Sequence, residues 1–571
     1  MIRPFPLAIV FALAGAACGE RASEPGPAPA DRVLLNGAVH TMDAGRRVAE
    51  AVAIRAGRIV FVGSTEDARA QIGAGTEVDD LEGRMLLPGF HDSHTHILIG
   101  VATEADCDLL RIPTRAEVIA RLEECRTLEG YGAEGWILGG GWGEWLFGVT
   151  GPRKETLDGI FGDRPVYLAS SFGHSAWVNS RALELAGIHG ETVAGEDGVI
   201  VRDPATGEAT GTLHESAMAL VTSIVPEKSL AERIDSVRAA IEMAHSLGVT
   251  AVIEPGVDGT VMEPILALAD AGEFDLRARL SLSPIAWQPG AFDDDVFAFL
   301  EGRAAWRRPN LDVDSVKIYM DGVIEYGTGA LLEPYTDDTF GLGPRFYTQE
   351  KLDEYFTRFD AMGLGIHVHA IGDAAVRMAL DAFETMRGKN GVSDNRHHMT
   401  HLQLIDEADI PRFGELGIGA TFQALWAYPD PAAMELDLPI LGEERTYRMY
   451  PIASVAASGG RVTGASDYWV TDMDPLLAIE VGVTRQDPYA DSGPVLNEGE
   501  RVDLDTMLAA YTINGAWTMG LEAEQGSIEI GKRADLVVLD RDLTAGDAYG
   551  ISDAKVTMTI FDGRTVYRRT D

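Results

Sequence analysis

Between residues 85 and 466, short apolar runs alternate with segments of helical character. Such alternation is typical of parallel strands joined by right-handed crossovers. Eight parallel strands close into a barrel whose functional side chains lie at the carboxyl ends of the strands. We therefore predict an α/β fold, a (β/α)8 TIM-type barrel spanning residues 85–521. The eight strands are expected near Met85–Phe90, Val249–Glu254, Leu276–Leu282, Val313–Tyr319, Leu364–His369, His397–Leu404, Ile418–Gln423 and Val462–Ser466.

Short β-type runs with glycine turns flank the predicted barrel on both sides. They occur within residues 32–84, at 33–37, 51–54 and 58–63, and again within 522–571, at 534–540 and 556–561. Because both ends show the same short β-type runs and glycine turns, we predict that they build one small composite β-sandwich together.

The segment between the first and second predicted strands is too long for a simple connection. We expect an inserted subdomain, at about residues 105–240, over the mouth of the barrel, where loops determine specificity.

The amino-terminal residues resemble a secretory signal. A basic start at Arg3 precedes an apolar run from Phe5 to Ala17, which is too short to span a membrane. Residues 1–18 are thus expected to be a signal peptide, with Cys18 placed as in a bacterial lipoprotein signal although Gly15 fits that pattern poorly. The Pro- and Ala-rich residues 19–31 would form a tether. We expect export to the periplasm or cell envelope, with membrane attachment through a lipidated Cys18.

The net charge of −42 makes nucleic acid and anionic membrane surfaces poor partners, which leaves a small-molecule substrate among the partners that the sequence allows. The charge could attract cationic substrates, but we prefer the interpretation that it forms a solubilising surface, and we infer no substrate from it. Cys107 and Cys125 could form a disulfide in an oxidising compartment or remain two thiols.

Histidines stand where a metal site would be expected in a barrel. His94 and His96 follow the first predicted strand, and on an extended chain both imidazoles point to the same side. A His-x-His pair alone is a weak signal, because isolated histidines are usually structural.

Lys317 lies in a strand that is apolar on both sides, where an unpaired ammonium group is costly. It could form an ion pair with a carboxylate. Alternatively, its amine could have reacted with carbon dioxide to give a carbamate, whose two oxygens could bridge two metal ions.

Two further histidine pairs lie at predicted strand ends. His369 shares a strand face with His367, and His401 stands near His398. Imidazole is the commonest nitrogen ligand of zinc, yet spacing alone does not decide which member of each pair binds metal.

Asp467 follows the eighth predicted strand. A carboxylate there could bind metal and take a proton from a metal-bound water, or it could instead cap a helix.

Together, the segment from Leu87 to His96 and the ordered residues Lys317, His369, His401 and Asp467 resemble the metal site of the amidohydrolase superfamily. More narrowly, the chain is similar to amidohydrolase family 3, which includes N-substituted formamide deformylases. The likeness extends from about Val33 to the carboxyl end. It includes the segments 141–145, 173–180, 211–215, 320–322 and 369–373.

The resemblance implies a distorted barrel and one or two divalent metal ions, with zinc the expected metal. It assigns His94, His96 and Asp467 to one ion and His369 and His401 to the second. The bridging carbamate would form on Lys317, and His367 and His398 would lie outside the ligand set.

The resemblance further implies that a metal-activated hydroxide cleaves an amide-type carbon–nitrogen bond other than a peptide bond, with Asp467 as the catalytic proton carrier. It places Trp142, His174 and Asn179 against the substrate. Trp142 could equally belong to the core of the insertion.

Two other functions stay open. A deaminase of a cyclic amidine or aminopurine would use a similar barrel, although deaminases of this superfamily generally lack the bridging lysine. A catalytically silent, envelope-anchored ligand-binding protein would keep the fold but lose the proton-transfer carboxylate. No nucleophile elbow or phosphate-binding loop is present in the sequence.

Overall fold

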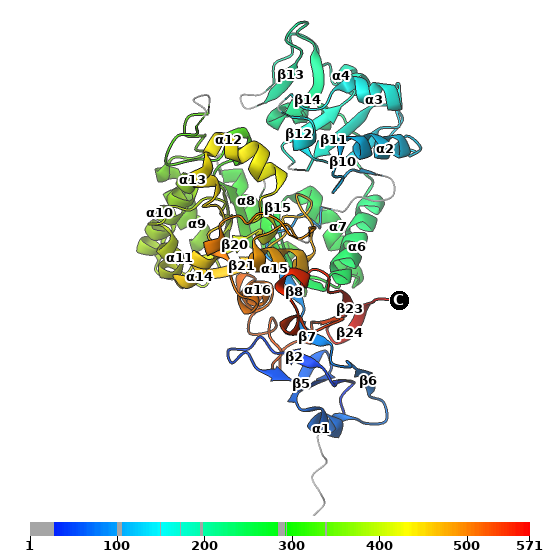
Figure 1. Ribbon diagram of the computed structural model, residues 1–571, viewed down its shortest axis with the longest axis vertical. Helices are drawn as coiled ribbons and strands as arrows, with labels where there is room; N and C mark the ends of the chain where they lie inside the picture. Colours follow the sequence, from blue (N-terminus) through cyan, green and yellow to red (C-terminus); the bar gives the residue numbers. More distant parts are fainter. Residues whose placement is uncertain are drawn as a thin grey trace, which may run out of the picture.

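The computed structural model describes residues 28–99, 106–148, 150–171, 173–194, 198–283, 292, 294–336, 340–490 and 492–570. Three bodies follow one another along its long axis: a β-domain from both ends of the chain, a central barrel, and an inserted subdomain at the opposite end (Figure 1). The predicted signal peptide and most of the tether lie outside the described residues. No helix in the described segments is long and apolar enough to cross a membrane.

Eight parallel strands form the central barrel, which confirms the predicted fold class. Their neighbour pairs are hydrogen-bonded in chain order, and the gap between the first and last is joined where the Ser93 amide donates to the Gly464 carbonyl at 3.0 Å. The strands are β8 (Phe90–Asp92), β15 (Val249–Val257), β16 (Arg277–Leu282), β17 (Leu311–Tyr319), β18 (Gly365–Ala370), β19 (His398–His401), β20 (Gly419–Phe422) and β21 (Arg461–Gly464).

The first predicted strand was wrong in one respect, because the apolar run near 85–90 divides between two sheets. Its first part is β7 (Met85–Pro88), which pairs with strands of the terminal domain, and only Phe90 starts the barrel. Pro88 has no amide hydrogen to donate, and a side chain at Gly89 would lie 2.3 Å from the Thr250 hydroxyl. This Pro-Gly step therefore lets the chain pass closely between the sheets.

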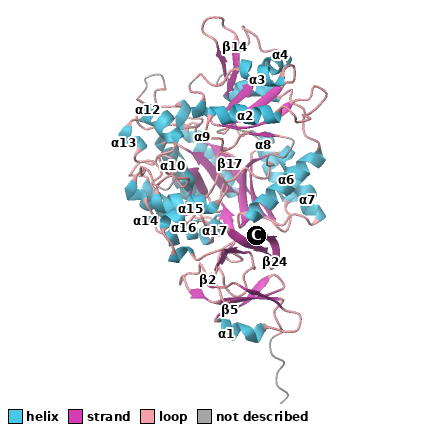
Figure 2. Ribbon diagram, turned by 45° about the vertical axis from the view of Figure 1, so that its right-hand side comes forward, coloured by secondary structure: helices cyan, strands magenta, loops and turns pink. Residues whose placement is uncertain are grey.

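Helices surround the barrel strands (Figure 2). In α9 (Gln349–Ala361), for example, Thr348 caps the first turn and Leu352, Tyr355, Phe356 and Phe359 form a buried stripe with helical spacing. The other helices of this body are α6 (Leu230–Ser246), α7 (Gly259–Ala271), α8 (Asp294–Glu301), α10 (Asp373–Asn390), α11 (Ile410–Leu416), α12 (Leu438–Leu441), α13 (Glu443–Thr446), α14 (Ile452–Ala457), α15 (Pro475–Thr484), α16 (Leu504–Ala510) and α17 (Ile513–Thr518).

Both ends of the chain contribute to one β-domain, as predicted. Strand β7 pairs antiparallel with β22 from the carboxyl end, so the two termini share one sheet. That sheet has the order β24 (Arg564–Arg568), β23 (Val556–Phe561), β22 (Leu536–Leu539), β7, β2 (Ala38–His40) and β3 (Val48–Ala49). The second sheet has the order β5 (Arg58–Gly63), β4 (Ala51–Arg55), β1 (Arg32–Leu35) and β6 (Glu77–Asp80), flanked by α1 (Thr65–Ala68).

The inserted subdomain has a mixed sheet and its own apolar core. A disulfide joins Cys107 to Cys125 across a Cα separation of 5.5 Å, which resolves the open pairing of these cysteines. The predicted boundary near 240 was too late, because α6 packs against α7 and β15 of the barrel. The elements of the subdomain are β9 (Cys107–Asp108), α2 (Arg115–Cys125), β10 (Ile137–Trp142), α3 (Lys154–Phe161), β11 (Val166–Ser170), β12 (Ser175–Val178), α4 (Ser180–Leu185), β13 (Val199–Arg202), β14 (Ala209–His214) and α5 (Ala219–Thr222).

Candidate metal centre and substrate cavity

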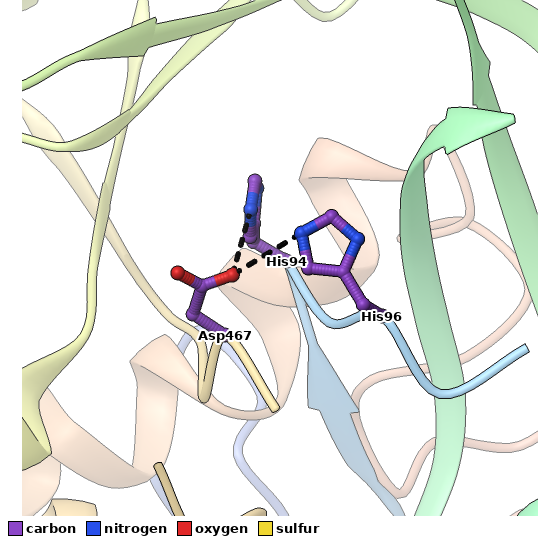
Figure 3. Close-up of side chains that lie close together, drawn as sticks. All are labelled: His94, His96 and Asp467. Atoms are coloured by element: carbon purple, nitrogen blue, oxygen red, sulfur yellow. Dashed lines mark ion pairs between the residues drawn. The ribbon is translucent and has the colours of Figure 1, made fainter. Parts of the chain in front are cut away.

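His94, His96 and Asp467 meet at the carboxyl ends of β8 and β21 (Figure 3). The Nε2 atoms of His94 and His96 lie 3.1 and 3.3 Å from the same oxygen of Asp467. The Asp467 amide also donates to the His94 carbonyl at 2.8 Å, so backbone and side chains bind the two segments together. No helix begins at Asp467, since the next one starts at Pro475 with Asp474 as its cap, and the alternative of a capping role is therefore wrong.

The surroundings keep this carboxylate ionised and the imidazole of His94 neutral. Burial raises the pKa of Asp467, but His94, His96 and His401 outweigh it and hold the pKa well below its usual range. Burial and the neighbouring Lys317 lower the pKa of His94. A carboxylate with neutral imidazoles is the protonation state that a divalent metal ion requires of its ligands.

A chain of hydrogen bonds fixes the orientation of His94. Its Nδ1 lies 2.7 Å from Nε2 of His367, whose Nδ1 lies 2.9 Å from the Ser281 hydroxyl. Ser281 in turn contacts the Ser315 hydroxyl, which donates to the Gly365 carbonyl. When Nε2 of His94 binds a metal ion, its lone pair is used there and the proton stands on Nδ1, so donation along the chain would run from His94 to that carbonyl.

The cavity geometry separates the members of the two ambiguous histidine pairs. His369 and His401 line the cavity, with ring centroids 4.4 Å apart. Nδ1 of His401 lies 3.2 Å from Oε1 of Gln423, and its ring stacks on Trp426 at an interplanar angle of 4°. His367 and His398 do not line the cavity and instead contact each other behind it.

Lys317 also lines the cavity, and its side chain is 1% exposed. Its Nζ atom has no hydrogen-bond partner among the described residues and lies 4.9 Å from the centre of the Tyr319 ring. Burial lowers the pKa of Lys317 to about 7, although Asp467 opposes the shift. The alternative of an ion pair with a carboxylate is not formed, and the amine is instead poised to be neutral near physiological pH.

The donor set fits a metal centre. Two imidazole nitrogens already lie around one carboxylate oxygen, two further imidazoles stand beside them, and a buried amine lacks a partner. Nitrogen and oxygen donors of this kind suit zinc and other divalent ions of the first transition row.

These residues form the floor of a cavity of about 600 Å³, whose other walls come from the insertion and the barrel loops. From the insertion, His174 lines the cavity, with Nδ1 3.1 Å from Oε2 of Glu215. Burial lowers the pKa of His174, but Glu215 outweighs this effect and raises it above its usual value. Glu215 lies in a segment that resembled the family, yet its pairing with His174 was not predicted.

Trp142 and Asn179, which we expected to contact the substrate, do not line this cavity. Trp142 is buried in the core of the insertion, where its indole donates to the Leu168 carbonyl. Oδ1 of Asn179 accepts from the amides of Val166 and Ala182, so the side chain caps α4. Their polar atoms are occupied by local structure, as the alternative for Trp142 had proposed.

Comparison with known proteins agrees with this geometry. Residues 77–567 match the amidohydrolase family. The chain is 32% identical over 552 residues to the protein LONG AFTER FAR-RED 3 of Arabidopsis thaliana, an alignment that covers 94% of this chain and 92% of that protein. It is 28% identical over 563 residues to the N-substituted formamide deformylase of Arthrobacter pascens, covering 95% and 99% of the two chains. The crystal structure of a metal-dependent hydrolase from Pyrococcus furiosus superposes with a TM-score of 0.67 at 26% identity, covering 90% of this chain and 99% of that one.

Proposed function

Because this chain belongs to the amidohydrolase family, we propose that it is a metal-dependent hydrolase that cleaves the carbon–nitrogen bond of a small non-peptide amide. The observation that carries the proposal is the joint position of His94, His96, Lys317, His369, His401 and Asp467 on the floor of one cavity. A formamide or another N-acyl amine is the substrate class that the relative from Arthrobacter supports.

His94, His96 and Asp467 would hold one divalent ion, while His369 and His401 would hold a second. A carbamate on Lys317 would bridge the two sites, and the buried, partnerless amine supports this modification because only a neutral amine reacts with carbon dioxide. Divalent metal ions in such a site supply Lewis-acid chemistry, lowering the pKa of a coordinated water and polarising the scissile carbonyl.

Asp467 moves the proton. Its depressed pKa leaves the carboxylate ionised at neutral pH, so it can accept a proton from the attacking water and pass it to the departing nitrogen. One water is consumed for each acid and amine released. The hydrogen bond from His94 to His367 keeps the imidazole beside Asp467 in one orientation throughout.

His174 is the residue of the insertion that we propose to contact the substrate. It lines the cavity from the insertion, and its pairing with Glu215 favours the protonated imidazole. A protonated His174 can donate to a carbonyl oxygen of the substrate and orient it.

The proposal is tested by turnover of N-formyl, N-acyl, cyclic-amide and aminopurine compounds by the purified, zinc-loaded enzyme in bicarbonate buffer. Asp467→Asn is the control, because it keeps the shape of the side chain but cannot carry the proton. Amine release that disappears in the variant supports the hydrolase. Ammonia released from aminopurines alone would favour a deaminase, and no turnover at all would favour a silent ligand-binding protein.

We also propose export to the cell envelope, with attachment through a lipidated Cys18. The Cys107–Cys125 disulfide supports an oxidising compartment. Labelling of expressing cells with a radioactive fatty acid, compared with Cys18→Ser, tests the attachment.

A further inference from the structure

Three of the acidic side chains that line the substrate cavity are neither proposed metal ligands nor paired with a cation. Glu325 follows β17, whereas Asp430 and Asp437 follow β20 at the two ends of the segment 430–437. The segments that carry Glu325 and Asp437 pack against each other. We refer to Glu325, Asp430 and Asp437 as the acidic pocket.

The nearest cationic group to the acidic pocket among the described residues is His174, which lowers the pKa of Glu325 but forms its ion pair with Glu215. None of the carboxylates of the acidic pocket forms an ion pair with a lysine, arginine or histidine in the described part of the chain, and Lys317 is the only lysine or arginine among the described residues that line the cavity. Arg485 lies nearby, but its guanidinium donates to the carbonyls of Met449, Tyr450 and Leu496.

Asp437 provides an independent indication of a ligand. Its side chain is 1% exposed, Oδ2 accepts from Nε2 of Gln403 at 2.8 Å, and Oδ1 has no hydrogen-bond partner in the described structure. A buried carboxylate oxygen without a donor is unfavourable by several kcal/mol unless a ligand supplies the donor. Gln403 orients the carboxylate, so that its remaining oxygen is available on the cavity wall.

The acidic pocket is close enough to the metal centre for one molecule to reach both. Gln403 lies two residues after His401, and consecutive Cα atoms are about 3.8 Å apart. Both also line the same cavity of about 600 Å³, which is the size of a small-molecule site.

An organic cation fits this pocket better than a metal ion does. In the described residues, only His94, His96 and Asp467 bring three histidine, cysteine or acidic ligand atoms within 4.8 Å of one another, so the three acids do not form a preassembled site for one metal ion. Tyr450 and Trp426 add aromatic walls to the cavity, and aromatic faces attract ammonium groups.

We propose that the acidic pocket binds an ammonium group of the substrate, so that the preferred substrates are N-acyl amines carrying a second, protonated amine. This inference rests on the proposed hydrolase function and names its substrate class. It comes from three side chains in one cavity and not from the net charge of the chain.

Burial and neighbouring carboxylates raise the pKa values of Glu325 and Asp437, as expected where negative charges outnumber positive ones. Burial and the nearby Glu144 and Asp430 raise the pKa of Glu325 to about 7. Burial, with Glu325 and Asp430, raises the pKa of Asp437 well above its usual value. A bound ammonium group would relieve this repulsion and favour the ionised carboxylates.

The test compares matched amides. N-acetyl and N-formyl diamines with two to six methylenes between the nitrogens are paired with N-acyl alkylamines in which a methyl group replaces the ammonium group. For the metal-loaded full chain, kcat/KM should favour the cationic member by about 100-fold or more at the best length, because a neutral tail leaves the buried carboxylates without a partner. Equal rates for the two members would overturn the proposal.

Asp437→Asn is the diagnostic variant, because an asparagine oxygen can still accept the hydrogen bond from Gln403. It should lower kcat/KM for the cationic amide by about 10- to 100-fold, the range for a hydrogen bond to a charged group, and leave the neutral amide nearly unchanged. Asp258→Asn is the matched control. Asp258 lines the same cavity and caps α7, and asparagine caps equally well, so this variant should change the preference by less than about twofold.

Calorimetric binding of n-butylammonium at pH 8 separates the two proposals. If wild type binds it and Asp437→Asn binds it at least about tenfold more weakly, the acidic pocket stands even when no amide is hydrolysed. If amides are hydrolysed but n-butylammonium binds both proteins equally or neither, the hydrolase stands and the acidic pocket is overturned.

Discussion

Replacement of His367 by phenylalanine should weaken metal binding without changing the walls of the substrate cavity, because His367 does not line it. Phenylalanine keeps an aromatic ring in a fully buried position but removes the nitrogen 2.7 Å from Nδ1 of His94. The His94 N–H would then be buried without an acceptor, and its ring would lose the contact that orients Nε2 toward Asp467.

The magnitude follows from the position of this hydrogen bond directly behind a ligand. Loss of a partner behind a metal-binding histidine typically costs 10- to 100-fold in affinity, which is about 1.4 to 2.7 kcal/mol. Leaving a buried N–H unsatisfied costs about 1–3 kcal/mol of folding free energy. Ser281→Ala removes only the next link and should have a smaller effect on affinity.

The assay is competition for zinc between each protein and a chromogenic chelator, with circular dichroism to confirm folding. His398→Phe is the matched control, because His398 is also buried, its ring lies 4.1 Å from that of His367, and it makes no contact with His94. Folded His367→Phe protein with wild-type zinc affinity, or an equal loss in His398→Phe, would refute the positioning role of His367.

Three further predictions concern stability and pH. Reducing the Cys107–Cys125 disulfide, whose cysteines are 18 residues apart, should destabilise the insertion by about 3 kcal/mol. Urea unfolding with and without reductant measures this difference, and an unchanged transition would contradict the prediction. Arg277→Leu leaves the buried Asp535 carboxylate without its partner at 2.7 Å, and it should lower the free energy of unfolding by about 3–5 kcal/mol in the same assay. The double variant Arg277→Leu/Asp535→Leu should recover part of this loss, whereas a loss below about 1 kcal/mol in Arg277→Leu would contradict the prediction. The carboxyl group of Glu325, which Glu144, Asp430 and His174 face, has a pKa raised to about 7, so it is neutral below that pH and charged above it. The affinity for n-butylammonium, measured by calorimetry, should therefore rise about tenfold from pH 6 to pH 8. An affinity that stays flat or falls with pH would contradict this prediction.

Much of the fold could be predicted from the sequence, because strands buried on both faces leave continuous apolar runs. The strands from β15 to β21 lie where those runs occur. The exception is the run from Met85 to Phe90, since apolar character shows that a segment is buried but not in which sheet. Only the Pro88-Gly89 step inside the run marks the change from the terminal domain to the barrel.

The histidine pairs show where sequence patterns stop being informative. His367 and His369 share one strand face, so alternation places both imidazoles inside the barrel. The structure separates them by depth, because His369 lines the cavity while His367 lies below it against His94. Spacing along a strand does not report that depth.

Substrate contacts could be predicted least well. Trp142 and Asn179 were chosen by resemblance, but their polar atoms are satisfied within the insertion. Glu325, Asp430 and Asp437 come from loops whose approach depends on the packing of the folded barrel. No local pattern in the sequence connects these three residues, and they became visible only as neighbours in one cavity.

The most direct test of the account is a metal titration of amide hydrolysis. Chelator-treated, metal-free enzyme is supplied with increasing zinc in bicarbonate buffer, and amine release is measured on the best substrate of the panel. We predict no turnover without metal and recovery that saturates at one or two zinc ions per chain, with one amine released for each acid. Undiminished turnover by verified metal-free protein, or no amine release by the fully loaded protein, would contradict the assignment of a metal-dependent carbon–nitrogen hydrolase.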